Sequence, residues 1–427
     1  MARQSAGKQT LRIEGVDVPV SNLDKLLYPA AGVTKGNVID YYIRVSQWLL
    51  PHLRDRPVTL KRYPDGVQGE HFYEKDAPSF TPEWVRTFPV PRRTGESDIN
   101  YIIVNDVATL VWAANLANLE IHPFLHRAPA IGTPTSIAFD LDPGEGATIG
   151  NCAEVAFLLK SVFDDLNLKS FAKVSGSKGI QVYVPLNSPA SYTVTQAFAR
   201  ALAELLEKQH PKLVISEMAK VARTRKVFID WSQNADYKTT VGVYSLRAKR
   251  ERPFVSSPVS WGELQHAKDL YFSPAEALAR CEKLGDLWAP VLTLKQELPE
   301  TFVSSVPKAA PARRAAKTLD AYQAKRNFAK TPEPAPEPAP RRSSQGSRRR
   351  FVIQKHAASH LHYDFRLEVH GVLKSWAVPK GVPYALDERR LATATEDHPL
   401  AYFDFEGIIP KGQYGGGTVM VWDIGTY

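Results

Sequence analysis

Two aspartates near the middle of the chain, Asp140 and Asp142, stand two residues apart in the segment TSIAFDLDPGEG. If the apolar residues around them form a strand, both carboxylates project from the same face, because side chains alternate along a strand. Two like charges about 4 Å apart repel by roughly 4 kcal/mol at an effective dielectric constant near 20. A divalent cation would cancel this repulsion, so the pair indicates a metal site. The alternative is a strand-to-turn motif in which Asp is chosen for local hydrogen bonds.

Two further segments add groups suited to phosphate chemistry. VSGSKGIQVYV (174–184) places Ser175 and Lys178 in a Gly-rich loop before a strand, where backbone N–H groups, a hydroxyl and an ammonium group could cradle a phosphate. RKVFIDWSQN (225–234) places Asp230 at the end of another apolar strand. Three acids beside such a loop are the groups needed for two-metal nucleotidyl transfer, in which ions roughly 3.5–4 Å apart stabilise the attacking and leaving oxygens. A flexible surface loop is the alternative for the Gly-rich segment.

A histidine cluster lies near the end of the chain, in FVIQKHAASHLHYDFRLEV. His362, Asp364 and Arg366 share one face of an expected strand, and His356 precedes them. Imidazole and carboxylate beside a guanidinium group suit a metal ion bound next to a phosphate. We therefore predict a metal site formed by His356, His362 and Asp364, with His360 standing apart.

The elements that would position the aspartates alternate between helices and strands over residues 10–300. Helical spacing of apolar residues is found over residues 38–53, with a predicted end at Pro51, and in AEVAFLLKSVFDDL and FARALAELLEKQH. TSIAFDLD, KGIQVYVPL and RKVFIDWSQ are rich in β-branched and aromatic residues and are predicted strands. Strands interleaved with helices predict a mixed α/β domain.

The character of the sequence changes after Pro299. Residues 301–350 are rich in Pro and then in Ser and Arg, which indicates a linker, with one short helix expected in LDAYQAKRNFAK. From Phe351, short runs such as LHYDFRLEV, SWAVP and GTVMVWD predict an all-β domain over residues 351–427. The chain stops directly after an expected strand, so we expect either a weakened β domain with open edges or a longer parent protein.

Composition limits the classes of protein. The 427 residues predict two or three domains. The net charge is +9, and residues 308–350 alone hold twelve Lys and Arg against three Asp and Glu, so the excess charge belongs to the linker, as a solvated spacer or a polyanion-binding tether. No apolar run approaches the roughly 18–20 residues of a membrane span. Two cysteines, Cys152 and Cys281, exclude a disulfide framework, and we expect a cytoplasmic protein.

DLDPGEG, SGSKG and VFIDWSQN, in this order, resemble the polymerase domain of bacterial DNA ligase D, a member of the archaeo-eukaryotic primase superfamily. LDKLLYP, LKRYPDGVQGEHFYEKD and YKTTVGVYSLR extend the resemblance over nearly all of residues 15–300. It implies a primase-like α/β fold with an RRM-like catalytic sheet. It also implies primer extension on broken DNA ends, with a preference for ribonucleotides and for manganese.

The resemblance assigns roles residue by residue. Asp140, Asp142 and Asp230 would hold two divalent ions, Mn²⁺ or Mg²⁺. Contacts to the incoming nucleoside triphosphate or its metal site are implied for His122, Ser175, Lys178, Arg223, Gln233 and Arg247. DNA contacts are implied for Lys25 and Lys35 at a downstream 5′-phosphate and for Phe72 and Tyr73 against template bases. Without the family, the lysines are surface residues, the aromatic pair is core packing, and His122 is a satisfied strand-edge histidine.

The histidine cluster, with SWAVPKG and EDHPLAYFDFEGIIPKGQYGGGTVMVWD, resembles the 3′-phosphoesterase domain of the same family, which implies a barrel-like fold and one Mn²⁺. The metal ligands would be His356, His362 and Asp364, with Arg366 and His398 as catalytic groups. Further phosphate-contacting positions are Arg326, Glu333, Lys380, Arg390 and Tyr402. Asn327 stands where the family usually has Asp. Since a neutral amide cannot replace a carboxylate as base or metal partner, we expect removal of a terminal ribonucleoside to be weaker than removal of a phosphate.

The leading hypothesis is a template-dependent nucleotidyltransferase acting at DNA double-strand-break ends in bacterial non-homologous end joining, fused to a partial 3′-phosphoesterase. Expected substrates are NTP or dNTP and DNA ends with a 5′-phosphate and a 3′-hydroxyl or 3′-phosphate. Expected partners are Ku and a separate or missing ligase domain, because no Lys-x-Asp-Gly motif occurs in a suitable context. One alternative is a non-catalytic DNA-end-binding scaffold, against which the intact acid set argues. The other is a protein whose main activity is the C-terminal phosphoesterase.

Overall fold

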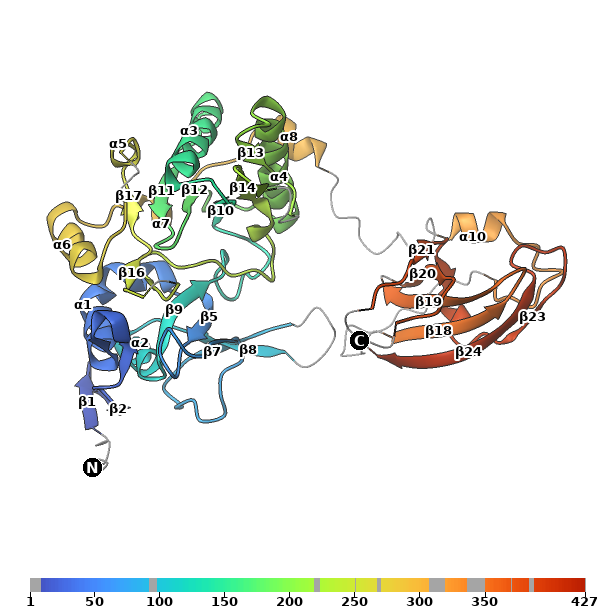
Figure 1. The fold of residues 1–427 in the computed structure, drawn as a ribbon, viewed down its shortest axis with the longest axis horizontal. Coiled ribbons are helices and arrows are strands. Elements are labelled where there is room, and N and C mark those ends of the chain that lie inside the picture. Colours follow the sequence, from blue (N-terminus) through green and yellow to red (C-terminus); the bar gives the residue numbers. More distant parts are fainter. Residues whose placement is uncertain are drawn as a thin grey trace. The chain divides into compact units, whose positions relative to one another are not determined.

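The protein divides into two compact units, whose helices and strands are drawn in Figure 1. The first comprises residues 1–90 and 99–306, and the second comprises the rest of the chain. The computed structural model describes residues 9–91, 98–218, 223–249, 251–266, 270–306, 319–335, 350–369, 371–383 and 388–426. Much of the predicted linker, residues 307–318 and 336–349, lies outside the described residues.

A six-stranded sheet in the first unit carries the aspartates and the Gly-rich loop. Its strands lie in the order β13 (Val214–Ile215), β14 (Val227–Asp230), β10 (Ser136–Pro143), β12 (Ile180–Pro185), β11 (Phe171–Val174) and β17 (Pro258–Val259). Neighbouring strands are antiparallel except β13 and β14, which are parallel. The strands predicted in TSIAFDLD, KGIQVYVPL and RKVFIDWSQ correspond to β10, β12 and β14.

Helices α3 (Ile149–Asp165) and α4 (Tyr192–Gln209) cover one face of this sheet (Figure 1). Each begins at a cap, where the side chain of Thr148 or Ser191 accepts a hydrogen bond from a backbone N–H three residues on. Alternate residues of β10, such as Phe139 and Leu141, are buried with these helices in one hydrophobic core. Asp140, which lies between them, therefore belongs to the opposite face of the sheet.

A second antiparallel sheet has five strands. β5 (Pro57–Arg62) pairs with β6 (Phe72–Glu74), β8 (Ile99–Ile103) and β9 (Asn118–Pro123), and β7 (Thr87–Val90) pairs with β8. Helices α1 (Lys35–Leu53) and α2 (Val107–Asn115) share a hydrophobic core with Leu60 and Ile121 of this sheet. The polar residues that alternate with these two, including Glu120 and His122, belong to its other face.

The end of helix α1 differs from the prediction. The sequence predicts a stop at Pro51, whereas the helix continues to Leu53 with Pro51 inside it. Proline removes one N–H donor from the helix. The last turn nevertheless closes, because the backbone N–H of Arg54 donates to Leu50 O (3.0 Å).

Further elements of the first unit are short. They are β1 (Gln9–Ile13), β2 (Val16–Val20), β3 (Leu26–Tyr28), η1 (Pro29–Ala31), β4 (Val33–Thr34), η3 (Trp231–Gln233), β15 (Leu246–Arg247), β16 (Phe254–Val255), α5 (Trp261–Leu264), α6 (Pro274–Leu284), α7 (Pro290–Thr293) and α8 (Glu300–Ser305). Cys152 and Cys281 are buried and free. Across the described part of the chain, we find no helix with the length and apolar character needed to cross a bilayer.

The second unit is built on one antiparallel sheet (Figure 1). Its strands lie in the order β21 (Thr393–Ala394), β20 (Val372–Val378), β19 (Leu361–Val369), β18 (Arg350–Ala357), β24 (Gly417–Thr426) and β23 (Gly407–Ile409), with β22 (His398–Pro399) also paired to β20. The all-β prediction is confirmed. Within the described residues the strand pairings form an open path and no closed barrel.

Part of the segment before Phe351 is integral to the second unit. The sequence predicts a linker with one short helix here. The helix is α10 (Asp320–Ala324), and it places Tyr322, which is 0% exposed, in the same core as Tyr402 of η5 (Leu400–Tyr402). The Tyr322 hydroxyl donates to Pro334 O (2.7 Å). This bond holds the irregular segment that follows α10 against the helix. One buried aromatic side chain thus anchors a segment whose composition is otherwise typical of a linker.

Candidate active sites

A cleft of about 1450 Å³ in the first unit is lined by residues of both sheets. Nine of the residues predicted from the sequence line it: Tyr73, His122, Asp140, Asp142, Ser175, Lys178, Arg223, Gln233 and Arg247. Segments far apart in the sequence therefore meet at one cavity. Asp230, Lys25, Lys35 and Phe72 are not part of its lining.

The paired aspartates share the polar face of β10. Asp140 lies directly opposite Asp230 on β14, so these side chains are also neighbours on one face. Burial, and then the charges of Asp142 and Asp230, raise the pKa of Asp140 to about 7. Burial also raises the pKa of Asp142. Asp140 is half-buried and Asp142 is accessible from the cleft. Carboxylates held together at such a position fit hard divalent cations, which prefer oxygen ligands.

Asp230 is engaged differently from the other two acids. One carboxylate oxygen accepts hydrogen bonds from the backbone N–H (3.0 Å) and hydroxyl (2.6 Å) of Ser232, and the other accepts from Gln233 Nε2 (2.8 Å). It thereby caps the short helix η3, so the local capping considered for Asp140 and Asp142 is found at Asp230 instead. The ligand atoms of the three aspartates do not all lie within 4.8 Å of one another. Among the described residues, His356, His362 and Asp364 of the second unit lie that close.

The Gly-rich loop is seated directly against β10. Ser175 Oγ accepts hydrogen bonds from the backbone N–H groups of Ser177 and Gly179, both at 3.2 Å, while Lys178 is exposed. A Cβ at Gly179 would meet Leu141 O at 2.2 Å, so only glycine allows this approach. The loop therefore presents a hydroxyl and an ammonium group beside the aspartates.

Several buried polar atoms around the cleft have no hydrogen-bond partner. They are Gln181 Oε1, Arg223 Nε and Gln233 Oε1. Arg247 Nη1 donates to Ser175 O (2.8 Å), which ties this guanidinium group to the loop. Arg223 stacks on Phe228, with its guanidinium carbon 3.6 Å from the ring centroid. Unpaired donors fit phosphate oxygens, and unpaired amide oxygens fit a cation or its water, so the residues present suit a metal–triphosphate ligand.

Glu120 is a cleft residue that the sequence analysis missed. It is 1% exposed, and its Oε2 lies 3.0 Å from His122 Nε2 and 3.2 Å from Arg247 Nε. On the neighbouring strand β5, Lys61 lies directly opposite Glu120. The sequence feature that could have identified Glu120 is an acid in the apolar strand NLEIHP, two residues from a histidine on the same face.

The two lysines expected at a 5′-phosphate lie together but are already engaged. The backbone N–H of Lys35 donates to Lys25 O (2.8 Å). Lys25 Nζ pairs with Asp65 (3.0 Å), and the buried Lys35 Nζ donates to Asn115 O (3.0 Å). Burial, and then the charge of Lys25, lower the pKa of Lys35. These contacts allow the assigned role only if the lysines exchange their partners.

The aromatic pair on strand β6 is at the surface. Phe72 is 44% exposed and Tyr73 is 54% exposed, which excludes the alternative of core packing. Cations lie over both rings, since Arg62 is 5.1 Å from the Phe72 centroid and Lys61 Nζ is 5.2 Å from the Tyr73 centroid. Exposed rings backed by cations are suited to stacking on bases.

In the second unit, neighbouring strands bring the histidine cluster together. His356 on β18 lies directly opposite His362 on β19, and their rings are 4.7 Å apart. Their nitrogens lie 3.4 Å and 3.7 Å from the two oxygens of Asp364, and one candidate ligand atom from each residue falls within 4.8 Å of the others. Burial would raise the pKa of Asp364, but Arg366 and the two histidines outweigh it and lower that pKa. This donor set fits a transition-metal ion, and the exposed His360 is outside it.

Arg366 lies behind the cluster and connects it to His398. Its Nη2 donates to Asp364 (3.0 Å), its Nε donates to Gln354 (2.7 Å) and its Nη1 lies 2.9 Å from His398 Nδ1. His398 Nε2 lies 3.2 Å from Arg326 Nη2. Because arginine only donates, Nε2 accepts from Arg326. Nδ1 faces a donor, Arg366, and an acceptor, the backbone oxygen of Glu396 (2.9 Å), and its protonation state satisfies only one of the two. Burial and both guanidinium charges hold the pKa of His398 well below its usual value, so His398 is neutral.

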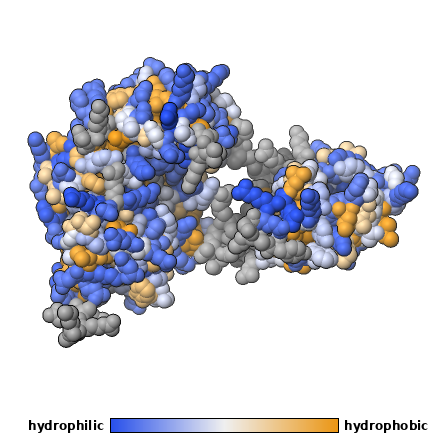
Figure 2. Space-filling view, viewed as in Figure 1, coloured by the Kyte–Doolittle hydropathy of each residue, from blue (hydrophilic) through white to orange (hydrophobic). Residues whose placement is uncertain are grey.

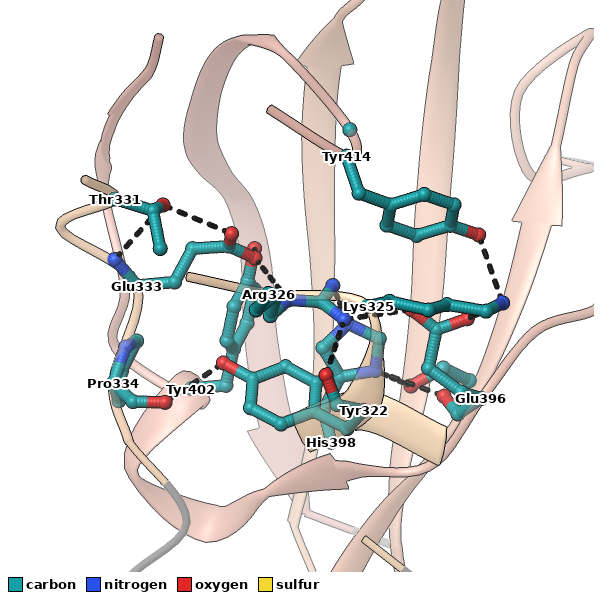
Figure 3. Close-up of polar contacts among 12 residues, drawn as sticks. Tyr322, Lys325, Arg326, Thr331, Glu333, Pro334, Glu396, His398, Tyr402 and Tyr414 are labelled. Atoms are coloured by element: carbon teal, nitrogen blue, oxygen red, sulfur yellow. Dashed lines mark hydrogen bonds and ion pairs between the residues drawn. The ribbon is translucent and has the colours of Figure 1, made fainter. Parts of the chain in front are cut away.

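Arg326 and Glu333 belong to a buried ion-pair network around His398 (Figure 3). Arg326 donates from Nε to Glu333 (2.7 Å) and from Nη1 to Glu396 (2.8 Å). Glu333 also accepts from the hydroxyl groups of Tyr402 (3.1 Å) and Thr331 (2.9 Å). The polar groups of Arg326, Glu333 and Tyr402, which the resemblance assigns to the phosphate, are thus bonded to other protein groups around His398.

The remaining predicted positions lie at the surface. Lys380 and Arg390 are exposed, and Arg390 pairs with Glu388. Asn327 is also exposed, and its Oδ1 accepts a hydrogen bond from the backbone N–H of Ala329 (3.1 Å). That contact is a local turn that an aspartate could form equally well.

Comparison with known families gives two matches. The model of the LigD primase-polymerase domain matches residues 34–288, and the model of the DNA Ligase D 3′-phosphoesterase domain matches residues 354–427. The chain is also similar to a solved structure described as the polymerase domain from Mycobacterium tuberculosis Ligase D in complex with DNA. The TM-score is 0.61 at 38% sequence identity, covering 66% of this chain and 98% of that chain.

Curated relatives match along most of this chain. The multifunctional non-homologous end joining protein LigD of Mycolicibacterium smegmatis is 42% identical over 412 residues, which is 96% of this chain and 51% of the relative. The LigD repair protein of Mycobacterium tuberculosis is 41% identical over 418 residues, which is 96% of this chain and 52% of the relative. The chain thus spans about half the length of these relatives.

Proposed function

The chain belongs to the LigD primase-polymerase family, and from this premise we propose that its first unit performs template-directed nucleotide addition to primer 3′ ends at DNA double-strand breaks. The observation that carries the proposal is the pair Asp140 and Asp142, half-buried and exposed respectively, beside the Ser175–Gly179 loop in one cleft. Like charges held side by side at a cleft, next to cationic groups that can bind phosphate, suit a metal-bound triphosphate better than they suit a purely structural role.

The proposed roles follow from the contacts. Asp140, Asp142 and Asp230 would hold two divalent ions, with Asp230 exchanging its bonds to Ser232 and Gln233 for one of them. Such ions, when bound, supply the positive charge that activates a primer hydroxyl and stabilises the leaving pyrophosphate. The remaining cleft donors would bind and orient the triphosphate: His122, Ser175, Lys178, Arg223 and Arg247.

Nucleotide and metal preferences are proposed from the family. We expect ribonucleotides to be used more readily than deoxynucleotides, and Mn²⁺ to support more activity than Mg²⁺. The test is extension of a primer on a gapped duplex, with NTP and dNTP compared in each metal. Wild type should add nucleotides and Asp230→Ala should not. If neither nucleotide is added under any of the four conditions, the proposal is wrong.

We further propose that DNA lies along the surface of β6. The similar structure named above is a complex with DNA, and Phe72 and Tyr73 offer exposed rings for template bases. Replacing both by Ala should weaken binding of a gapped duplex by about 1–3 kcal/mol per lost stack. Phe80→Ala is the matched control, because this ring is 59% exposed and belongs to the following loop. Equal losses in both variants would argue against a template path over β6.

A second candidate function, 3′-phosphate removal, is favoured by the His356–His362–Asp364 group beside Arg366. We propose that this group holds one Mn²⁺ and that Arg366 stabilises charge on the phosphate. His398, being neutral and buried, would position Arg366. The test is release of phosphate from a 3′-phosphorylated primer–template by the full chain. Asp364→Asn should abolish it, and a fully active variant would contradict the assignment.

Ku and a ligase activity are proposed as partners because the relatives are named as end-joining proteins. The competing proposal is a non-catalytic DNA-end-binding scaffold. A scaffold predicts that Asp142→Ala changes nothing measurable, whereas the polymerase proposal predicts that this variant binds DNA and adds no nucleotide. Gel-shift and extension assays on the same preparation separate the two.

A further inference from the structure

Glu120 is a buried acid on β9 whose two oxygens face different surroundings. Oε1 is fixed by the interior, since it accepts from the Tyr63 hydroxyl (3.3 Å) and the backbone N–H of Ala248 (3.2 Å). Oε2 lies 3.0 Å from His122 Nε2 and 3.2 Å from Arg247 Nε, both of which line the cleft. The side chain therefore connects the protein core to a histidine and an arginine that line the cleft.

The strand register produces this arrangement. Glu120 lies directly opposite Lys61 on β5, and His122 lies directly opposite Thr59. Glu120 and His122 share one face because they are two residues apart. Leu119 and Ile121, which alternate with them, are fully buried in the hydrophobic core, so the strand cannot turn to expose the acid.

Glu120 is held in its charged form by its partners. Burial would raise the pKa of Glu120, but the hydrogen bond from His122 and the charges of Arg247 and Lys61 outweigh burial and lower that pKa strongly. A buried carboxylate contributes little to net stability compared with apolar packing. Its presence under the cleft is therefore better explained by what it does to its partners.

We propose that Glu120 is a positioning residue for triphosphate binding, which it serves by orienting His122 and Arg247 toward the cleft. This inference rests on the proposed function of the first unit. Arg247 is also tied to the phosphate loop through Nη1 and Ser175 O (2.8 Å), so the two anchors leave its other donors for a polyanion. Because His122 Nε2 bonds to Glu120, Nδ1 is the ring nitrogen left for a phosphate. Burial lowers the pKa of His122, although Glu120 opposes this, so the charge of a bound polyanion supplies the further stabilisation of the second proton that Nδ1 needs to donate.

Simple electrostatics makes the opposite prediction for loss of this acid. If Glu120 only neutralised charge, its removal would leave the charges of Arg247 and Lys61 uncompensated and would tighten binding of a triphosphate. If Glu120 orients them, its removal weakens binding. The sign of the change in affinity therefore decides between the two roles.

The experiment compares Glu120→Gln with the matched control Asp286→Asn in the full chain. Asp286 is mostly buried, with its side chain 15% exposed. It accepts from the Tyr244 hydroxyl (2.7 Å), His52 (2.8 Å) and the backbone N–H of Trp288 (2.9 Å), three donor types that also surround Glu120. It does not line the cleft. Both variants should lose thermal stability to a similar degree.

Binding is measured by calorimetry with inorganic tripolyphosphate and with ATP, each without DNA. We expect Glu120→Gln to weaken both about tenfold, and Asp286→Asn to stay within twofold of wild type. Nitrogen-15 NMR of the His122 ring gives a second readout: the proton should reside on Nε2 in wild type and redistribute in Glu120→Gln only. A merely structural acid would not change this tautomer.

The outcomes separate this inference from the proposed function. Unchanged or tighter tripolyphosphate binding in Glu120→Gln would overturn the positioning role, even if wild type extends primers. Weaker binding in that variant with an inactive wild type would support the positioning role while the polymerase proposal fails. A wild type that binds no tripolyphosphate would overturn both.

Discussion

Asp140 on β10 lies directly opposite Asp230 on β14 in an antiparallel pair, so two acids from distant parts of the sequence meet on one face of a sheet. Asp142 extends the group by one strand repeat. Opposed like charges destabilise a strand pair. The fold therefore holds an arrangement that is unfavourable without a cation, and this has consequences that can be measured.

Replacing Asp140 by Asn should stabilise the protein in the presence of a chelator. The amide keeps the shape and removes a half-buried charge that Asp142 and Asp230 repel, so we expect a gain on the order of 1–3 kcal/mol at pH 8. Thermal melts of wild type and variant with EDTA measure it. Added Mn²⁺ should raise the melting temperature of wild type by more than that of the variant, and equal shifts would argue against binding at this acid pair.

Acid should destabilise the first unit partly through His126. This ring is 0% exposed, stacks on Phe124, and its Nδ1 lies 2.8 Å from the Tyr192 hydroxyl. Burial, and then the charge of Arg56, lower the pKa of His126 to about 4. The unfolded chain takes up this proton near pH 6.5 and the folded chain only near pH 4, so stability falls as pH decreases through that window.

The loss of folding free energy from His126 alone approaches about 3 kcal/mol, which follows from the difference between its pKa in the unfolded and folded chain. Urea unfolding of wild type and His126→Gln at pH 7, 6, 5 and 4 isolates it, because the other groups titrate in both proteins. Wild type should lose more stability than the variant. Parallel curves would show that His126 does not charge on unfolding.

Gly179→Ala should displace the phosphate loop. The added Cβ would meet Leu141 O at 2.2 Å, and overpacking of this kind costs about 1–3 kcal/mol. We expect reduced stability together with weaker ATP binding, measured by melting and calorimetry. Gly132→Ala is the control, since a Cβ there meets nothing within 4 Å. Normal ATP affinity in Gly179→Ala would separate the loop from the triphosphate.

Asn327→Asp should add activity in the second unit. The Asn327 Oδ1 contact with the Ala329 N–H is one that Asp can also make, so the fold should be retained. The new carboxylate supplies the charge that removal of a terminal ribonucleoside is expected to need. A primer with one 3′-terminal ribonucleotide is the substrate. Equal, low ribonucleoside release by wild type and variant would rule out Asn327 as the cause.

The sequence predicted the strands that carry the chemistry because their apolar alternation is strong. β10, β12, β14 and β19 lie where the pattern indicated, with Asp140 and Asp142 on the polar face. The hydrogen-bond partners of these acidic side chains were not predictable from the sequence. The bonds from Asp230 to Ser232 and Gln233 depend on how η3 turns after the strand, which residue types alone do not specify.

Other differences arise from contacts between distant segments. The Glu120–Arg247 ion pair joins residues that only the tertiary fold brings together. The surface position of Phe72 and Tyr73 reflects the short edge strand β6, where the pattern alone favoured core packing. Tyr322 anchors a Pro-rich segment through one buried ring, which composition averages conceal.

The central claim is that the aspartate cleft and the histidine cluster are two separate catalytic sites on one chain. A single reaction tests it, with a gapped duplex carrying a 3′-hydroxyl primer and a second labelled primer carrying a 3′-phosphate, in Mn²⁺ with all four NTPs. Asp142→Ala should stop extension and leave phosphate release intact, and His362→Ala should do the reverse. Loss of both activities in either variant, or loss of neither in both, would contradict the account.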